Sequence, residues 1–201
     1  MAEGMVGAVR RKPIPAGRIK LAPQKVTLDE IEPAIWRRFC VRSDLTLLKL
    51  HDVLQAVMGW ENCHLHQFSG QGKRFTDFRS EARDEESADE RKTRLDQVLL
   101  IPSQSLQYEY DFGDGWRHTV TLEEIAHRDD GKDIVPLCID GARNCPPDNC
   151  GGVGGYEEVL KAIQSPDDRQ FEELATWAGD YDPEKFDLKK INRMLKKMRR
   201  S

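Results

Sequence analysis

The sequence predicts an α+β fold. A mostly antiparallel sheet, built from the N-terminal two-thirds of the chain, is expected to pack against one central helix and about three C-terminal helices. Segments that alternate apolar and polar residues dominate the front of the chain and are typical of half-buried strands. Apolar residues at helical spacing dominate the back. Strands followed by helices favour α+β over alternating parallel βαβ units.

The first strands are expected after a tail. Residues 1–17 contain glycines, two prolines and a basic cluster without periodicity, which predicts a disordered lead-in. Residues 18–201 are expected to form a single domain. Ile19–Leu28 and Ile35–Val41 are rich in β-favouring residues and flank the turn-like Glu32-Pro33 pair. They predict a hairpin.

The central helix is expected from Thr46 to Met58. Its apolar residues fall on one helical face, Ser43 or Thr46 can cap its start, and Gly59 stands where a left-handed C-terminal residue belongs. A short strand over His64–Phe68 and a returning strand at Lys73–Phe75 are expected next.

An acidic loop and a second hairpin follow. Asp77–Glu90 contains seven acidic residues and almost no apolar ones, which predicts a solvated, flexible loop. Tyr108–Leu122 alternates on both sides of Gly113–Gly115, which predicts a hairpin with a three-residue turn. The expected cross-strand pairs are Phe112 with Trp116, Tyr110 with His118, Tyr108 with Val120 and, on the other face, Asp111 with Arg117.

Three helices are expected to close the chain, after a connector rich in Pro and Gly over residues 136–155. Each shows an apolar stripe with helical spacing. The stripes begin at Tyr156, Phe171 and Leu188.

Composition argues against several classes of protein. The net charge of −4 gives no global attraction to nucleic acid or to an anionic membrane. No apolar run approaches the roughly 18 residues that a membrane span needs, and residues 1–17 lack the apolar stretch of a signal peptide. We therefore expect a cytoplasmic protein with no membrane partner. Its five cysteines, an odd number, are expected to be reduced.

Four stretches carry a family resemblance: Ile35–Arg38, Leu65–Phe68, the string YDFGDGWRH over Tyr110–His118 and the string CPPDNCGG over Cys145–Gly152. With them the chain resembles the plasmid pRiA4b ORF-3-like family, also labelled as TnpR-type passenger proteins of insertion elements. The resemblance runs from about Ile19 to the last helix. It implies an α+β fold and no established biochemical activity. The TnpR label comes from genetic neighbourhood, and the chain lacks the serine nucleophile, arginine cluster and helix-turn-helix of a resolvase.

Two sets of residues could bind a divalent metal. His64 and His66, two apart on a predicted strand, project to the same face, where neutral imidazoles could hold one cation. Ordinary hydrogen-bonded histidines of a half-buried strand are the favoured alternative. The second set, Cys138, Cys145 and Cys150, lacks the paired C-x2-C spacing of a zinc ribbon, so small buried thiols are favoured there.

The Gly113–Gly115 turn is the ligand site that the sequence favours most. It displays Asp114 at a ribbon tip, and Trp116 and His118 lead away along the apolar face. If His64 and His66 lie at the same end of the sheet, carboxylate and imidazole groups could together bind a metal or transfer a proton. A structural turn with Asp114 capping its own backbone and the histidines dispersed is favoured over this composite site. No catalytic residue is assigned.

Three further patterns each have a structural explanation that we favour over a functional one. Gly151–Gly155 precedes a helix as a phosphate cradle would, but Glu157 and Glu158 follow and the Walker lysine is absent, so a connector turn is expected. Lys189–Arg200 contains seven basic residues and no acidic one and could contact nucleic acid, although such cations also complement a helix dipole. Aromatic-basic pairs could stack a nucleobase, but we expect each aromatic ring to point inward and each arginine outward. These pairs are Trp36 with Arg37 and Arg38, and Trp116 with Arg117.

The leading functional hypothesis is a non-catalytic binding or adaptor module for an unknown protein or small ligand, with no predicted cofactor. The alternative is a metal- or histidine-dependent enzyme. The third is a nucleic-acid accessory factor of a mobile element.

Overall fold

The computed structural model describes residues 19–77, 86–128, 136–165 and 168–198. The expected tail over residues 1–17 lies outside them. The strands are β1 (Ile19–Leu28), β2 (Trp36–Arg42), β3 (His66–Gly70), β4 (Lys73–Thr76), β5 (Ala88–Asp89), β6 (Ser105–Tyr110), β7 (Trp116–Leu122), β8 (Ala126–Arg128) and β9 (Leu137–Ala142). The helices are α1 (Leu47–Met58), α2 (Leu95–Val98), α3 (Gly152–Gln164), α4 (Glu172–Ala178) and α5 (Leu188–Met198).

The strands form one mostly antiparallel sheet, as expected. Its order is β5-β4-β3-β6-β7-β1-β2-β9, with β8 paired to β1, and its one parallel pair among the described residues is β4 with β5. Both hairpins were expected, β1–β2 from β-favouring residues around Glu32-Pro33 and β6–β7 from alternation. The sequence analysis missed β9, which lies inside the predicted connector, and the short elements β5, β8 and α2.

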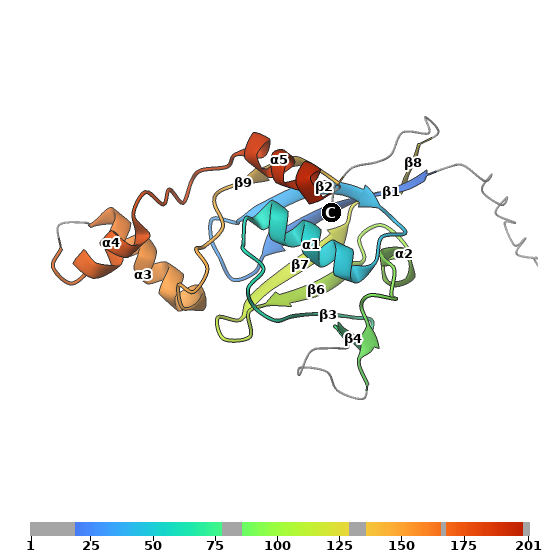
Figure 1. Cartoon of the computed structure of the whole chain (residues 1–201), viewed down its shortest axis with the longest axis horizontal. Coiled ribbons are helices and arrows are strands. Elements are labelled where there is room, and N and C mark those ends of the chain that lie inside the picture. Colours follow the sequence, from blue (N-terminus) through green and yellow to red (C-terminus); the bar gives the residue numbers. More distant parts are fainter. Residues whose placement is uncertain (1–18, 78–85, 129–135, 166–167, 199–201) are drawn as a thin grey trace, which may run out of the picture.

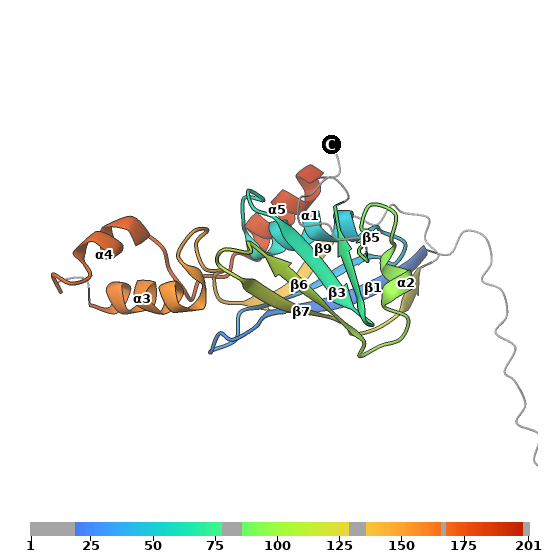
Figure 2. The same ribbon diagram turned by 90° about the horizontal axis from the view of Figure 1, so that it is seen from below.

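Helices α1 and α5 cover one face of this sheet (Figures 1 and 2). The side chain of Thr46 accepts a hydrogen bond from the Lys49 backbone, and Gly59 is left-handed, so both predicted caps of α1 are confirmed. The opposite face presents hydrogen-bonded polar pairs, Ser105 with Thr121 and Gln107 with Thr119. The apolar core therefore lies between the sheet and α1.

Helices α3 and α4 lie beyond one end of the sheet (Figure 1). The expected packing of all three C-terminal helices against the sheet therefore holds for α5 alone. Helix α3 buries Tyr156, Val159 and Ala162, whereas α4 buries none of its residues. Helix α4 is therefore held mainly by contact with α3.

The register of the second hairpin differs from the prediction by two residues. Trp116 pairs with Tyr110, not with Phe112, and five residues connect the strands. The chain leaves β6 because Asp111 is left-handed, with φ 57°, and its carboxylate accepts a hydrogen bond from the Gly113 backbone. A shift of two keeps the residues of β6 and β7 on their predicted faces, since strand alternation has a period of two.

The end of the acidic segment is not a solvated loop. Residues 78–85 lie outside the described residues, but Ser87, Asp89 and Glu90 are buried and Ala88–Asp89 pairs with β4. The prediction is therefore wrong for the end of this segment. Asp89 accepts hydrogen bonds from Arg91, and Glu90 faces a histidine, so each buried charge has a partner.

One predicted aromatic-basic arrangement is reversed. Trp116 is buried and Arg117 exposed, as expected, but in β2 the buried residue is Arg37 and Trp36 lies on the other face. Arg37 points inward because its guanidinium donates to three backbone carbonyls, those of Val57, Trp36 and Ala142, at 2.7–2.9 Å. The Trp36 ring instead forms cation–π contacts with Lys25 and Arg38.

Candidate functional site

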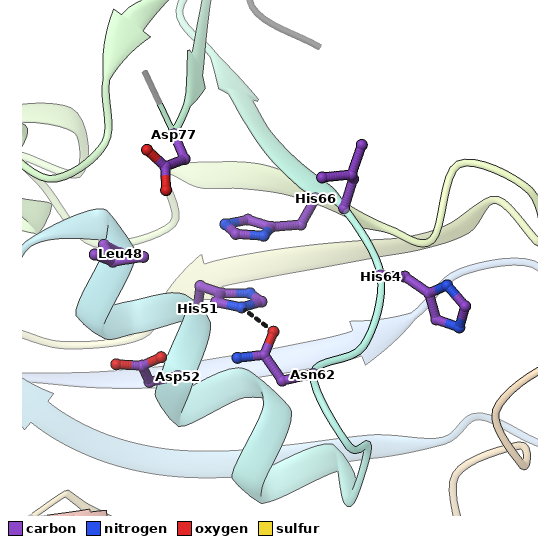
Figure 3. Close-up of a pocket in the computed structure, with 8 residues that line it drawn as sticks. Leu48, His51, Asp52, Asn62, His64, His66 and Asp77 are labelled. Atoms are coloured by element: carbon purple, nitrogen blue, oxygen red, sulfur yellow. Dashed lines mark hydrogen bonds between the residues drawn. The ribbon is translucent and has the colours of Figure 1, made fainter. Parts of the chain in front are cut away.

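A pocket of about 520 Å³ opens between α1 and the start of β3 (Figure 3). It is lined by Leu48, His51, Asp52, Asn62, His64, Leu65, His66 and Asp77. We call it the histidine pocket. It joins residues that are far apart in the sequence, because α1 crosses the sheet face from which His66 projects.

Two imidazoles form the wall of the histidine pocket. The rings of His51 and His66 are stacked, with centroids 3.5 Å apart and planes within 3° (Figure 3). His51 lies on the buried side of α1, and His66 is the first residue of β3, where it pairs with Tyr110. Because two stacked cations would repel each other, this geometry suits a pair in which at most one ring is charged.

Burial keeps His51 neutral, and a closed hydrogen-bond network fixes its tautomer. Its Nδ1 lies 2.8 Å from the Tyr108 hydroxyl, which also accepts a hydrogen bond from Gln55, and its Nε2 lies 2.7 Å from Oδ1 of Asn62. Asn62 Oδ1 accepts only, so Nε2 carries the proton and Nδ1 accepts from Tyr108. Burial, with the charge of His66 as a smaller cause, lowers the pKa of His51 to about 3.

His66 is held by a buried carboxylate. Its Nε2 lies 3.0 and 3.1 Å from the two oxygens of Glu90, whose side chain is fully buried. Backbone bonds from Glu90 to Thr76 and from Leu48 to Glu90 fix this carboxylate between the sheet and α1. Because Nε2 donates to Glu90, the other ring nitrogen of His66 is free of hydrogen bonds to the described residues and is available to a ligand.

Sequence reasoning missed both partners of His66. His51 stands beside the apolar stripe of α1, and a histidine on the buried side of a predicted helix is a usable signal. Glu90 is the last residue of the acidic segment. No alternation of apolar and polar residues in that segment indicates which carboxylate is buried. Only the long-range pairing of β4 with β5 selects it.

The two predicted metal-binding histidines are not brought together. His64 precedes β3, so strand alternation does not extend to it, and Figure 3 shows its ring turned away from His51 and His66. Its Nε2 lies 3.5 Å from Oδ2 of Asp111. It also lies in a group with Cys63 and Asp148, whose ligand atoms are all within 4.8 Å of one another.

The other residues of the predicted composite site have separate partners. Asp114 accepts a hydrogen bond at 3.2 Å from the Gly151 backbone, at the N-terminus of α3. Trp116 and His118 are fully buried against Trp60. Burial lowers the pKa of His118 to about 4. Asp114 therefore contacts the glycine run, and its carboxylate lies where the phosphate of the rejected cradle would have bound.

The three predicted cysteines belong to the connector. Cys138 and Cys145 are buried, and Cys150 is half-buried. Burial raises the pKa of Cys138 to about 11 and that of Cys150 to about 12. Among the described residues, the group of potential metal ligands formed by Cys63, His64 and Asp148 contains none of these three cysteines. Their burial fits thiols that pack as small apolar side chains.

Comparison with known proteins places the chain in a family. A family model described as plasmid pRiA4b ORF-3-like protein matches residues 20–190. The chain belongs to the plasmid pRiA4b ORF-3-like family. The family match covers every residue of the histidine pocket.

Two relatives of this pRiA4b ORF-3-like chain are informative. The uncharacterized protein y4hQ of Sinorhizobium fredii (strain NBRC 101917 / NGR234) is 36% identical over 180 residues, which cover 85% of this chain and 88% of that protein. The crystal structure of MM3350, a protein of unknown function from Methanosarcina mazei Go1, matches with a TM-score of 0.75 and 36% identity. That match covers 86% of this chain and 96% of the other. Neither name assigns an activity.

The described helices are all too short or too polar to cross a membrane. Helix α5 packs on α1 and β9 through Ile191 and Leu195, and its cations are exposed. This packing explains its amphipathic pattern.

Proposed function

We propose that this protein binds a small, hydrogen-bond-donating molecule in the histidine pocket, and that the His66–Glu90 pair accepts a proton from it. The carrying observation is the fully buried Glu90 carboxylate at 3.0 Å from Nε2 of His66. The arrangement favours the histidine-dependent alternative over the non-catalytic module that led the sequence analysis.

The proton transfer follows from the tautomer of His66. Nε2 donates to Glu90, so the neutral ring carries its lone pair on Nδ1. A ligand O–H or N–H that meets Nδ1 can pass its proton there, leaving an oxygen or nitrogen base on the ligand and an imidazolium on His66. Glu90 stabilises that imidazolium and holds the ring in place, as a carboxylate does in a catalytic triad.

His51 contributes a neutral surface. Because its Nδ1 and Nε2 are both bonded within the protein, His51 does not compete for the ligand's proton. It fixes the plane of His66 by stacking at 3.5 Å. We therefore regard His51 as a positioning residue.

The charges around the pocket select the ligand class. Asp52 and Asp77 line it, and Glu90 lies behind His66. Three carboxylates disfavour an anionic ligand and favour a neutral or cationic one, such as a polyol or an amine. Asp52 is paired with Lys49 at 3.2 Å, and Asp77 lies 3.8 Å from Arg91, so the pocket is not strongly negative.

Two measurements test the proposal. Amines and polyols (ethanolamine, putrescine and glycerol) are titrated into labelled protein and followed by NMR, with acetate as the anionic comparison. We expect shifts confined to pocket residues, and binding weakened about tenfold or more by His66→Ala. Acylation of His66 by p-nitrophenyl acetate, with release of p-nitrophenolate, measures the nucleophilicity of Nδ1. We expect Glu90→Gln to slow it by at least about tenfold, because the amide stabilises the imidazolium that forms during the attack less well than the carboxylate does.

His127→Ala is the matched control, since His127 is exposed on β8. Circular dichroism verifies that each variant is folded. The proposal fails if acetate binds as well as the amines do, or if Glu90→Gln leaves the acylation rate unchanged.

A second candidate function follows from α5 and from the expected link to mobile elements. Five cations are exposed on this helix: Lys189, Lys190, Arg193, Lys196 and Lys197. Such a face supports phosphate binding. A salt-dependent gel shift with single-stranded and duplex DNA tests it, and charge reversal at Lys190 and Arg193 should abolish the shift.

A further inference from the structure

A second cluster of reactive side chains lies outside the His66–Glu90 pair. Cys63 and His64 lie between α1 and β3, and Asp148 lies in the connector that leads to α3. One ligand atom from each lies within 4.8 Å of the others. Ligands of a tetrahedral ion with bonds of about 2.0–2.3 Å are roughly 3.3–3.8 Å apart, so small side-chain rotations would close this group around one ion.

His64 supplies an independent reason to expect a ligand. Its Nε2 is buried and has no hydrogen-bond partner among the residues that the structure describes, although Oδ2 of Asp111 lies 3.5 Å away. Leaving a buried polar atom unsatisfied is costly, so such atoms commonly mark a missing partner. Because Asp111 lies beside this same nitrogen, it is close enough to serve as a fourth ligand.

The donor set selects the kind of metal. A thiolate, an imidazole and a carboxylate match Zn²⁺ and its tetrahedral analogue Co²⁺, whereas Mg²⁺ and Ca²⁺ require oxygen ligands throughout. The Cys63 thiolate and the Asp148 carboxylate carry two negative charges, which balance a divalent ion. Cys63 is exposed, so an ion can reach its sulfur from solvent.

We propose that Cys63, His64 and Asp148 form a Zn²⁺ site, with Asp111 supporting it. On binding, the Cys63 thiol releases its proton to solvent and forms a sulfur–zinc bond. The ion would connect the segment between α1 and β3 to the connector before α3. These segments already meet where the Glu61 backbone donates to Asp148 at 3.1 Å. The site does not depend on proton transfer at His66.

Metal titration of the purified full-length chain tests the proposal. After removal of metals with a chelator, Zn²⁺ is added in competition with a chromophoric chelator. We expect one equivalent to bind. Co²⁺ should give intense tetrahedral bands in the visible range and a near-ultraviolet thiolate-to-cobalt band. His64→Ala and Asp148→Ala should each weaken Zn²⁺ binding at least tenfold, the smallest loss that even outer-shell changes commonly cause.

Cys63→Ser distinguishes this site from the other thiols. It should remove the thiolate-to-cobalt band, whereas the matched variant Cys150→Ser should keep it. His66→Ala should bind Zn²⁺ like the unaltered chain, which separates this proposal from the histidine pocket. Persistence of the band in Cys63→Ser, failure to bind one equivalent, or loss of binding in His66→Ala would each overturn it.

Discussion

Buried histidines link the folding of this protein to pH. His51 and His118 have pKa values lowered to about 3 and about 4, in both cases mainly by burial. Their unfolded-state values are near 6.5. Between pH 6.5 and 4 the unfolded chain therefore binds more protons, and the free energy of unfolding falls as the pH falls.

Urea denaturation at pH 7 and pH 5 measures this effect. We expect each buried histidine to account for a loss of about 2 kcal/mol over that interval. Replacing the fully buried ring in His118→Phe removes one titrating group, so the loss should shrink by about half. His127→Ala should leave it unchanged. Equal stability of the unaltered protein at both pH values would contradict the assigned burial.

Neighbouring arginines on β2 allow a matched comparison. Arg37 is 2% exposed and donates to three carbonyls, so Arg37→Met removes three hydrogen bonds of a buried guanidinium. We expect a loss of about 2–4 kcal/mol in the free energy of unfolding. Arg38 forms a partly solvent-screened ion pair with Glu123, so Arg38→Met should cost about 1 kcal/mol or less. Chemical denaturation of both variants checks the ordering, and a reversed order would refute it.

At the scale of elements, apolar periodicity and turn signals predicted most strands and helices. They failed where the backbone or the burial of a segment does not follow the periodicity. The two hairpins follow from β propensity, a turn signal and alternation, and α1 follows from helical spacing and its caps. These signals lie within a few residues of the structure they specify. The register of β6–β7 was wrong because alternation cannot show that Asp111 adopts a left-handed conformation. Strand β9 was missed because its two outward apolar residues, Leu137 and Ile139, are exposed at the sheet edge.

The glycines at the start of α3 differ in what surrounds them. A Cβ on Gly155 would overlap the carbonyl oxygen of Cys150, whereas a Cβ on Gly154 would meet no atom within 4 Å. Gly155→Ala should therefore displace the first turn of α3 and lower the melting temperature. Gly154→Ala should raise it slightly, because alanine is favoured over glycine in a helix by up to about 1 kcal/mol. Thermal denaturation followed by circular dichroism compares them, and similar effects of the two changes would argue against this close approach.

At the scale of the whole molecule, the sequence predicted the α+β class but not the candidate site. The histidine pocket combines His51 of α1, His66 of β3 and Glu90 after β5. No pattern within one segment reports that these three meet, since their contact depends on strand order and on where α1 crosses the sheet. Of these three residues, only His66 was predicted as a site residue. The prediction paired it with His64, whose ring is turned away from His51 and His66.

The distribution of burial predicts where the molecule opens most readily. Val26 of β1 and Val120 of β7 are fully buried at the centre of the sheet, whereas α4 buries no residue and exposes half of Trp177. Because amides exchange through local opening, α4 should exchange about a hundredfold faster than these strands, a difference of about 2.7 kcal/mol in opening free energy. Hydrogen–deuterium exchange with mass spectrometry measures both regions. Protection of α4 equal to that of β7 would contradict the prediction. Protection that rises with protein concentration in α4 but not in β7 would instead indicate that a second copy covers α4, because association that only stabilised the whole fold would protect both regions.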